Sequence, residues 1–516
     1  MPPGKISFAP IGQNHRENSM AQKPLTKKQI VIWCFALALV FICAAAFAMP
    51  RVFSKEKTQV FPVVAYEGPE PLEPLEGVGI SVNETPLFVY NMPVNNSHSW
   101  VNAGDPPVAY CPMAYYDCDG RAKVTITLDE AVESTVVRPL SAGIKPKIEG
   151  NTVSFYVEKP GQYVAEFNGS VVNAAHLFVN PVETDVPDVN DENVRYIGPG
   201  LWDIGSISLK SGQTLYIAGG AVVYGAVQAK EAKNVTVCGR GILDGSVYES
   251  WTHKNTVARV PINLTSCKNA FVEGVILLNP NAWAVSALSC EDSFIDNIKI
   301  VTSRQNGDGI SLQSCKGFTV SGSFVRSWDD SLVIKNYEGS SDGVTFRNMV
   351  LWTDLAQSME VGYETNKGLW PKVEIRNILF ENITVLHNFH KPVMSIHNGD
   401  DATVKDVIFR NVTVEDAQMG RGDAGENNQL IEVNIASTTW SSTRARGQVM
   451  DILFENIAVL GGNVPPIRIM GYDDEHKVEN VTVRNLSILG QPVTSLDDIT
   501  YQSNLFVSGV NVEVQP

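Results

Sequence analysis

The sequence lacks any long stretch in which apolar residues recur at the 3.6-residue spacing of an amphipathic helix. This absence favours β-structure over α-structure along the whole chain. Charged residues are also sparse, at 19% of the chain, and the formal net charge is −16. An acidic chain lacks the basic surface that nucleic acids require, so we expect no nucleic-acid partner. The same charge disfavours a polyanionic substrate.

Cysteine is scarce, with eight residues in 516, and the recurring cysteines have no His or second Cys at the spacing of a zinc site. Cys267, Cys290 and Cys315 each follow a Ser and lie 23 and 25 residues apart. We interpret them as a buried ladder of small apolar side chains rather than as disulfides or metal ligands. No metal or other cofactor is therefore expected.

Ten short segments repeat along the chain, each with two alternating apolar strands around a polar corner. They begin at Asn234, Asn269, Asp292, Gly317, Gly343, Asn377, Asp406, Asp451, Asn480 and Asn504. Most neighbouring starts lie 23 to 29 residues apart, and the longer gaps indicate coils that carry longer loops. A period in this range is typical of solenoids and propellers.

An Asn recurs at the corner of the later repeats, where its side chain tolerates a left-handed backbone. These corners are Asn348, Asn382, Asn411, Asn456 and Asn485. We predict an all-β protein, with a right-handed parallel β-helix over residues 191–516 as the catalytic domain. A propeller is the alternative, but its blades need about 40 residues each.

A different pattern precedes the repeats. Residues 77–190 contain several short alternating strands separated by turn signals such as Lys159-Pro160-Gly161, which predicts a small β-sandwich. Residues 49–76, rich in proline towards their end, are predicted to be a linker.

The N-terminal residues 1–48 have the pattern of a targeting segment. Lys27-Lys28 precede an apolar run over residues 30–49, and Ala46-Phe47-Ala48 resembles a small-residue cleavage site. We expect a cleaved signal peptide or, alternatively, an uncleaved membrane anchor formed by residues 30–49. Either way the remainder is exported, as a secreted, periplasmic or anchored protein. Export permits disulfides, and Cys111 with Cys118 is the one candidate pair.

Three carboxylates are expected to converge on neighbouring coils. Four aligned strands begin at Trp283, Asp308, Asp330 and Gln357. In this register the inward residues are Val285, Ile310, Leu332 and Met359, so the starting residues form an outward column beside Asp329. Coils stack about 4.8 Å apart, which places Asp308 and Asp330 together. Crowded carboxylates raise one pKa, as a general acid requires; ordinary capping or calcium-binding Asp residues are the alternative.

The tetrapeptide NGDG from Asn306, followed by WDDS from Trp328, resembles the active site of β-helical glycoside hydrolases. These are the polygalacturonases of family 28 and the dextranases and isopullulanases of family 49. The separation of 21 positions from Asp308 to Asp329 is similar to family 28, whereas a β-sandwich before the helix is more like family 49. The resemblance implies hydrolysis with inversion, in which Asp329 is the general acid and Asp308 and Asp330 activate water.

The sequence departs from the polygalacturonase pattern at two basic positions. Gln357 stands where those enzymes carry a His, and Ser395-Ile396-His397 stands where they carry Arg-Ile-Lys. A typical galacturonan substrate is therefore doubtful, and a neutral or differently charged polysaccharide or oligosaccharide is favoured. The expected substrate-binding residues are Trp283, Asn306, Lys335, Gln357, Glu360, Glu364 and His397. A β-helical polysaccharide lyase and a non-catalytic glycan-binding adhesin are the alternative functions.

Overall fold

The computed structural model describes residues 61–95, 108–368, 370–418, 420 and 428–515. The chain divides into two units, and the described residues all belong to the second, Val60–Pro516. The predicted targeting segment lies outside the described residues. Among the residues described, no helix is long and apolar enough to cross a membrane. The only helices in this part of the chain are short 3-10 turns at Leu140–Ala142 and Leu496–Asp498.

The N-terminal part of this unit is a β-sandwich of two sheets. One sheet contains β1 (Val64–Ala65), β4 (Tyr90–Asn95), β5 (Val108–Asp117), β7 (Thr135–Arg138), β10 (Gly161–Phe167) and β11 (Ser170–Asn180). The other contains β2 (Val78–Val82), β3 (Thr85–Pro86), β6 (Ala122–Leu128), β8 (Lys147–Glu149) and β9 (Thr152–Val157). Alternating residues of both sheets, such as Val124, Phe155 and Phe167, form the core between them.

Two expectations for this region need correction. Strand β1 lies inside the predicted linker and pairs with β5, so the folded domain begins before Gly77. Cys111 and Cys118 are both free thiols rather than a disulfide. They are seven residues apart along an extended segment, and an odd separation directs side chains to opposite faces. Cys118 lies in the core of the sandwich, whereas Cys111 faces the other side of its sheet.

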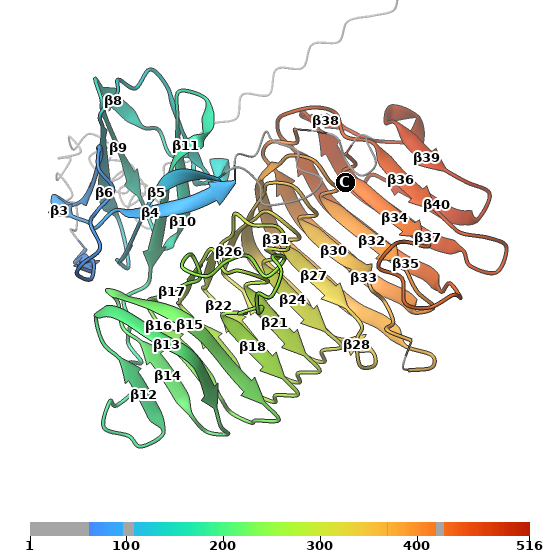
Figure 1. Ribbon diagram of the computed structural model, residues 1–516. Helices are drawn as coiled ribbons and strands as arrows, with labels where there is room; N and C mark the ends of the chain where they lie inside the picture. The colour runs from blue at the N-terminus through green and yellow to red at the C-terminus, as the bar shows by residue number, and fades with distance from the viewer. Residues whose placement is uncertain (1–60, 96–107, 369, 419, 421–427, 516) are drawn as a thin grey trace, which may run out of the picture. The chain divides into compact units, whose positions relative to one another are not determined.

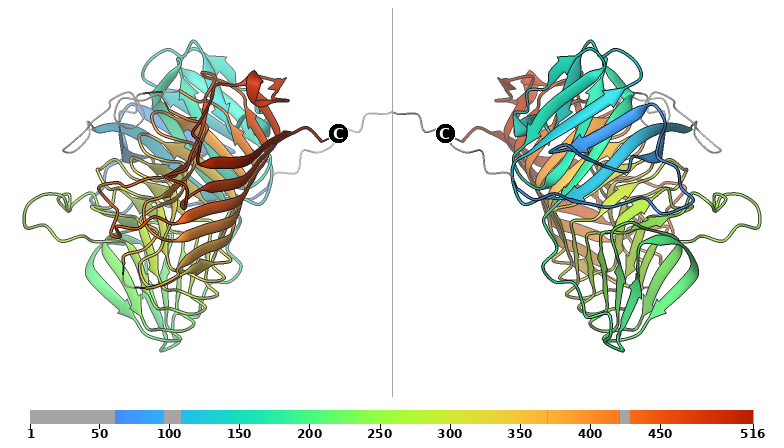
Figure 2. Two further views of the ribbon diagram at one scale, coloured as in Figure 1. Left: turned by 90° about the vertical axis from the view of Figure 1, so that its right-hand side faces the viewer. Right: turned by 90° about the vertical axis from the view of Figure 1, so that its left-hand side faces the viewer.

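The remaining strands form a right-handed parallel β-helix, a single sheet of 29 strands from β12 to β40 (Figure 1). Views from the two ends show the coils one behind another (Figure 2). The first strands of successive coils are β15 (Ala221–Lys230), β18 (Ile262–Thr265), β21 (Val285–Leu288), β24 (Ile310–Gln313), β27 (Leu332–Lys335), β30 (Met359–Tyr363), β32 (Met394–Asn398), β34 (Ile431–Ile435) and β36 (Ile467–Met470).

The other two sides of each coil are separate strands early in the helix and merge into one long strand later. The early strands are β16 (Thr236–Gly239), β17 (Ile242–Asp244), β19 (Phe271–Glu273), β20 (Ile276–Leu278), β22 (Phe294–Asp296), β23 (Lys299–Val301), β25 (Thr319–Ser321) and β26 (Phe324–Ser327). The long strands are β29 (Thr345–Thr353), β31 (Glu374–Asn388), β33 (Thr403–Val414), β35 (Gln448–Val459) and β37 (Val478–Ile488). The remaining strands are β12 (Val194–Ile197), β13 (Gly200–Leu209), β14 (Thr214–Ile217), β28 (Ser341–Asp342), β38 (Gln491–Pro492), β39 (Tyr501–Ser503) and β40 (Val507–Glu513).

The predicted side-chain ladders are confirmed. All five corner Asn residues of the later coils have positive φ, and from Asn382 onward each amide donates to the side-chain oxygen of the previous corner, as from Asn411 to Asn382 at 2.9 Å. Inside the helix, Phe346, Phe380, Phe409 and Phe454 stack with ring centroids 4.7 to 5.2 Å apart. Cys267, Cys290 and Cys315 are buried and free. Identical positions on successive coils therefore stabilise one another.

The sandwich packs against the helix face formed by β20, β23, β26, β29 and β31. The contact is apolar, through residues such as Phe178 and Phe324, but it encloses charged groups as well. Arg326 on β26 is fully buried, with Nη1 3.3 Å from His176 Nε2 and its guanidinium 4.1 Å from the centre of the Trp352 ring. Arg326 precedes the predicted Asp329-Asp330 pair by only three residues, so the sandwich supports the coil that carries these acids.

Replacement of Phe409 by Ala should lower the free energy of unfolding by about 3–5 kcal/mol, because it leaves a cavity and breaks two ring stacks. Chemical denaturation measures the effect. Phe294→Ala is the matched control, since Phe294 is 48% exposed on the outer surface and should change stability by less than about 1 kcal/mol. Equal losses in the two variants would contradict the proposed role of the internal stack.

Candidate active site

The three acids come from two successive coils. Asp308 immediately precedes the strand region of β24, and the Asp329-Asp330 pair precedes β27. The amide of Gly309 donates to the carbonyl oxygen of Asp330 at 2.8 Å, and the amide of Ser331 donates to that of Gln357 at 2.9 Å. These backbone bonds place Asp308, Asp330 and Gln357 on neighbouring coils, in the register that the sequence predicted.

A chain of buried hydroxyl groups supports these turns. Ser327, Ser331, Thr353 and Ser358 are linked Oγ to Oγ at 2.7 to 2.8 Å across the coils. Ser327 also donates to the carbonyl oxygen of Asp329 at 2.6 Å. The turn of the acid pair is therefore held by hydrogen bonds as well as by packing.

The acids open into a pocket of about 270 Å³. Its walls are formed by Trp251, Trp283, Asn306, Asp308, Asp329, Asp330, Lys335, Gln357, Tyr363, Glu364, Lys391 and Trp440. Asp308 and Asp330 lie at its floor and are only 3% and 7% exposed, whereas Asp329 is half-buried. The backbone N–H of Asp330 donates to Asp329 Oδ1 at 3.0 Å and orients that carboxyl group.

Burial and mutual repulsion disturb the floor carboxyls strongly. Burial, followed by the charge of Asp329, raises the pKa of Asp308 well above its ordinary range. The same two causes, with the charge of Glu360, raise the pKa of Asp330 to about 8. The expected effect of crowding is thus seen at two carboxyls rather than one. The acid cluster retains protons at a pH where isolated Asp residues are ionised.

Lys335 is the principal counter-charge. Its Nζ lies 3.2 Å from Glu364 Oε2 and 3.9 Å from Asp308 Oδ2, and it also lies 5.0 Å from the centre of the Trp283 ring. Burial acts to raise the pKa of Glu364, but Lys335 and Lys367 outweigh it and lower that pKa. Lys335 therefore offsets part of the negative charge of Asp308 and Glu364, and it also covers one face of the Trp283 ring.

Five of the predicted substrate-binding residues line the pocket, namely Trp283, Asn306, Lys335, Gln357 and Glu364. Glu360 and His397 do not. Both are buried, and the His397 ring stacks face to face with Tyr363 at 4.2 Å. They point outward from their strands, as the register requires, but the Tyr363 ring covers His397, and Glu360 is hydrogen-bonded to His397 and Ser395. Sequence register predicts the face of a strand, and not which neighbouring side chain folds over it.

His397 lies between two carboxylates. Its Nδ1 is 2.9 Å from Glu360 Oε2, and its Nε2 is 3.4 Å from Glu432 Oε2. Burial acts to lower the pKa of His397, but the two Glu charges outweigh it and raise the pKa to about 10. The imidazolium is therefore neutralised locally and supports Tyr363, whose hydroxyl accepts a 3.0 Å bond from the Gln357 amide.

The pocket also contains residues that the sequence did not indicate: Trp251, Lys391 and Trp440. Trp251 comes from the long loop between β17 and β18 and Trp440 from the loop between β34 and β35, where the repeat provides no register. Lys391 could have been found, because it precedes β32 by three residues, as Asp329 precedes β27. Within the described residues, no group of three or more His, Cys, Asp or Glu side chains is arranged to hold a metal ion.

Comparisons with known proteins identify the family of this chain and structures with a similar fold. The family model described as glycosyl hydrolases family 28 matches residues 220–500. Among solved structures, Dex49A from Penicillium minioluteum is similar, with a TM-score of 0.60, 14% identity, and coverage of 87% of this chain and 96% of that one.

Two more distant structures are also similar. An exopolygalacturonase from Thermotoga maritima has a TM-score of 0.47 and 18% identity, with coverage of 62% of this chain and 84% of that one. The catalytic unit of a GH87 α-1,3-glucanase from Streptomyces thermodiastaticus has a TM-score of 0.43 and 15% identity, with coverage of 87% and 86%. A search of curated protein sequences found no match.

The crowding of the acids should be visible as a dependence of stability on pH. A carboxyl whose pKa is raised on folding stabilises the protonated folded state, and that contribution is lost as pH rises from about 4 through about 8. Asn has no carboxyl group to ionise, so Asp330→Asn should not lose stability at this position as pH rises. We expect the variant to gain roughly 1–3 kcal/mol relative to the wild type between pH 5 and pH 8, as measured by denaturant unfolding.

Asp342→Asn is the matched control. Asp342 accepts hydrogen bonds from Asn377 and Arg376, which lower its pKa, so its contribution to stability is present at neutral pH and lost in acid. The two substitutions should therefore change the pH dependence in opposite senses. A parallel change in both would show that Asp330 carries no raised pKa.

Proposed function

Because this chain belongs to family 28 of the glycosyl hydrolases, we propose that it cleaves O-glycosidic bonds of a polysaccharide or oligosaccharide at the Asp308–Asp329–Asp330 pocket. The observation that carries this proposal is the convergence of three carboxyls from two adjacent coils in one pocket. A fold optimised for stability alone would separate these charges.

The proposed reaction is a single displacement with inversion. Asp329, the most accessible of the three acids, donates a proton to the glycosidic oxygen as its bond to the anomeric carbon breaks. A water held by Asp308 and Asp330 attacks the opposite face of that carbon, and its proton passes to one of these carboxylates. The products are a sugar with a free reducing end and the released alcohol.

The proposed reaction requires a proton on Asp329 and ionised carboxylates at Asp308 and Asp330, although burial raises the pKa of both floor carboxyls. The charge of Lys335 favours ionisation of both Asp308 and Asp330, and the charge of Lys391 favours ionisation of Asp330. The two lysines therefore assist formation of the base.

The charges of the pocket support an uncharged glycan as substrate. Lys335 is engaged by Glu364 and Asp308, and His397 is covered by Tyr363 and neutralised by two Glu side chains. Gln357, at the position where the polygalacturonase pattern has a basic residue, is neutral. Lys391, the other lysine of the described pocket wall, acts on Asp330. A uronic acid carboxylate would therefore compete with the acids of the pocket for these cations.

We further propose that the protein acts after export, because the basic pair Lys27-Lys28 and the apolar run over residues 30–49 precede the folded unit.

Asp329→Asn should lower hydrolysis by at least about 10³-fold while glycan binding is retained, because the variant keeps the shape of the pocket but has no proton to donate. Release of reducing ends and retention in affinity electrophoresis measure the two properties. Asp342→Asn, outside the pocket, is the control and should remain active. Near-normal turnover by Asp329→Asn would contradict the mechanism. If the wild-type protein binds the glycan but does not cleave it, the result would favour an adhesin.

Substrate charge is tested with a panel of dextran, pullulan, arabinan and de-esterified pectin. We expect reducing ends from at least one uncharged glycan and none above background from the pectin, because the two lysines that line the described part of the pocket, Lys335 and Lys391, already interact with its acidic groups. An unsaturated product that absorbs in the ultraviolet would indicate a lyase instead. Rapid cleavage of the pectin would overturn the assignment of an uncharged substrate.

A further inference from the structure

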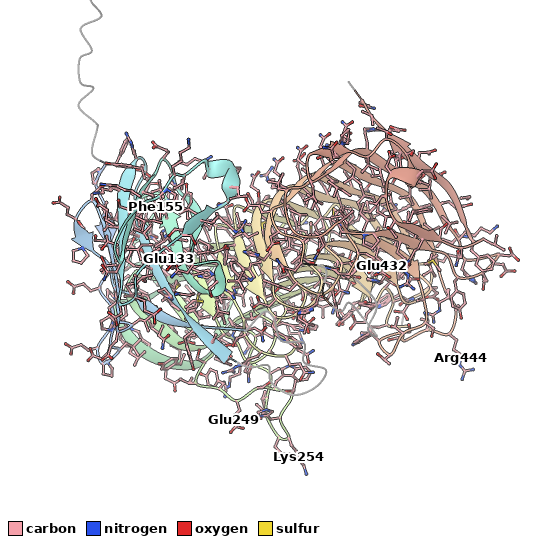
Figure 3. All side chains as sticks on the ribbon, turned by 90° about the horizontal axis from the view of Figure 1, so that it is seen from above. Glu133, Phe155, Glu249, Lys254, Glu432 and Arg444 are labelled. Atoms are coloured by element: carbon pink, nitrogen blue, oxygen red, sulfur yellow. The ribbon has the colours of Figure 1, made fainter. Side chains whose placement is uncertain are left out.

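Two exposed tryptophans line the pocket from opposite sides of the acids. Trp251 precedes β18, two coils before the strand of Asp308, and Trp440 follows β34, three coils after the strand of Asp330. Trp251 is 39% exposed and Trp440 is 54% exposed, yet both contribute to the same pocket wall. Their loops project from the strand surface, as the positions of Glu249, Lys254 and Arg444 show (Figure 3).

The loop of Trp251 is fixed by buried polar groups. The Asn281 amide, 1% exposed, donates to the carbonyl oxygens of Glu249 and Val257 at 2.9 and 3.0 Å. The carbonyl oxygen of Asn281 accepts the backbone N–H of Trp251 at 3.0 Å. Arg304 donates to the carbonyl oxygen of Tyr248 at 2.5 Å. These bonds clamp the loop on both sides of the tryptophan.

The loop of Trp440 is held by hydrogen bonds to the buried side chain of Asp400. Asp400 is fully buried and accepts the backbone N–H groups of Ser442 and Thr443 at 2.6 and 2.8 Å. The indole of Trp440 lies 5.1 Å from the Tyr363 ring, which in turn stacks on His397. The aromatic wall therefore rests on the buried Glu360–His397–Glu432 network rather than on a mobile side chain.

An exposed indole on an anchored loop leaves apolar surface in water that a bound ligand could bury. Apolar surface that is held rigidly around a polar centre is typical of a binding site. The C–H faces of a pyranose ring provide a flat apolar surface that matches an indole. Trp283 is less suited, because Lys335 occupies one of its faces.

We infer that Trp251 and Trp440 are the stacking platforms of two sugar subsites on either side of the bond that is cut. This inference rests on the proposed function and adds to it the class of ligand that the two sites bind, uncharged pyranose rings. The acids act between the platforms, so a productive substrate contacts both. Loss of either platform weakens the binding of the whole glycan without altering the acids.

The test uses the full chain in the inactive Asp329→Asn background, with dextran, pullulan, arabinan and pectin as separate probes in affinity electrophoresis. We expect Trp251→Ala and Trp440→Ala each to weaken retention by the best-bound uncharged glycan at least about tenfold. The Phe variants should recover part of the loss, because a smaller ring still stacks. Trp202→Ala is the matched control, since Trp202 is 46% exposed on β13 and lies outside the pocket.

The outcomes separate this inference from the proposed function. The inference that Trp251 and Trp440 stack on sugar rings would be wrong if both Ala variants were retained by the glycan as strongly as the Asp329→Asn protein. It would also be wrong if no probe retained the Asp329→Asn protein. Hydrolysis by the wild-type chain tests the proposed function independently. In an otherwise wild-type chain, each Trp→Ala variant should raise KM at least about tenfold and change kcat less than about threefold. A fall in kcat alone would also contradict the inference. An Ala variant whose circular dichroism spectrum shows that it has not folded is excluded, and the Phe variant at the same position then tests the inference.

Discussion

The hydrogen-bonded ladder between parallel coils is the constraint on which the rest of this structure depends. Each coil repeats the backbone bonds of the previous one, so that every outward residue has a neighbour about 4.8 Å away. Individual bonds contribute only about 1 kcal/mol net, but the ladder continues through 29 strands and is reinforced by stacked Phe rings and corner Asn side chains. Charge repulsion at one position is too small to change this spacing.

The acids of the site use this rigidity. Asp308 and Asp330 remain adjacent because their strands are in register. The strands do not move apart to relieve the repulsion between the two carboxylates, so the pKa of each carboxyl is raised instead. The hydroxyl chain from Ser327 to Ser358 and the buried Arg326 beside His176 add support below the acid pair. The β-sandwich is thus part of the scaffold that holds the site, rather than an appendage to the helix.

Specificity, by contrast, lies in the parts that interrupt the repeat. The loops of Trp251 and Trp440 differ in length and in their anchors, Asn281 and Asp400, and each brings one indole to the pocket. Tyr363 and the buried His397 complete one wall. A uniform ladder with variable loops allows the acid centre to be retained while the glycan that reaches it changes.

The sequence by itself determined the repeat, the inward and outward faces of each strand and the convergence of Asp308 with Asp330. The faces follow from two-residue alternation, and the convergence follows from coils of similar length around the acids, which place equivalent residues side by side. It also identified Trp283, Lys335 and Gln357 as neighbours of the acids by the same register. Only the tertiary structure decided that Tyr363 covers His397, that Cys111 and Cys118 face different cores, and that Trp251 and Trp440 reach the pocket. Those outcomes depend on loops and on packing between distant segments, where no local periodicity specifies which side chains meet.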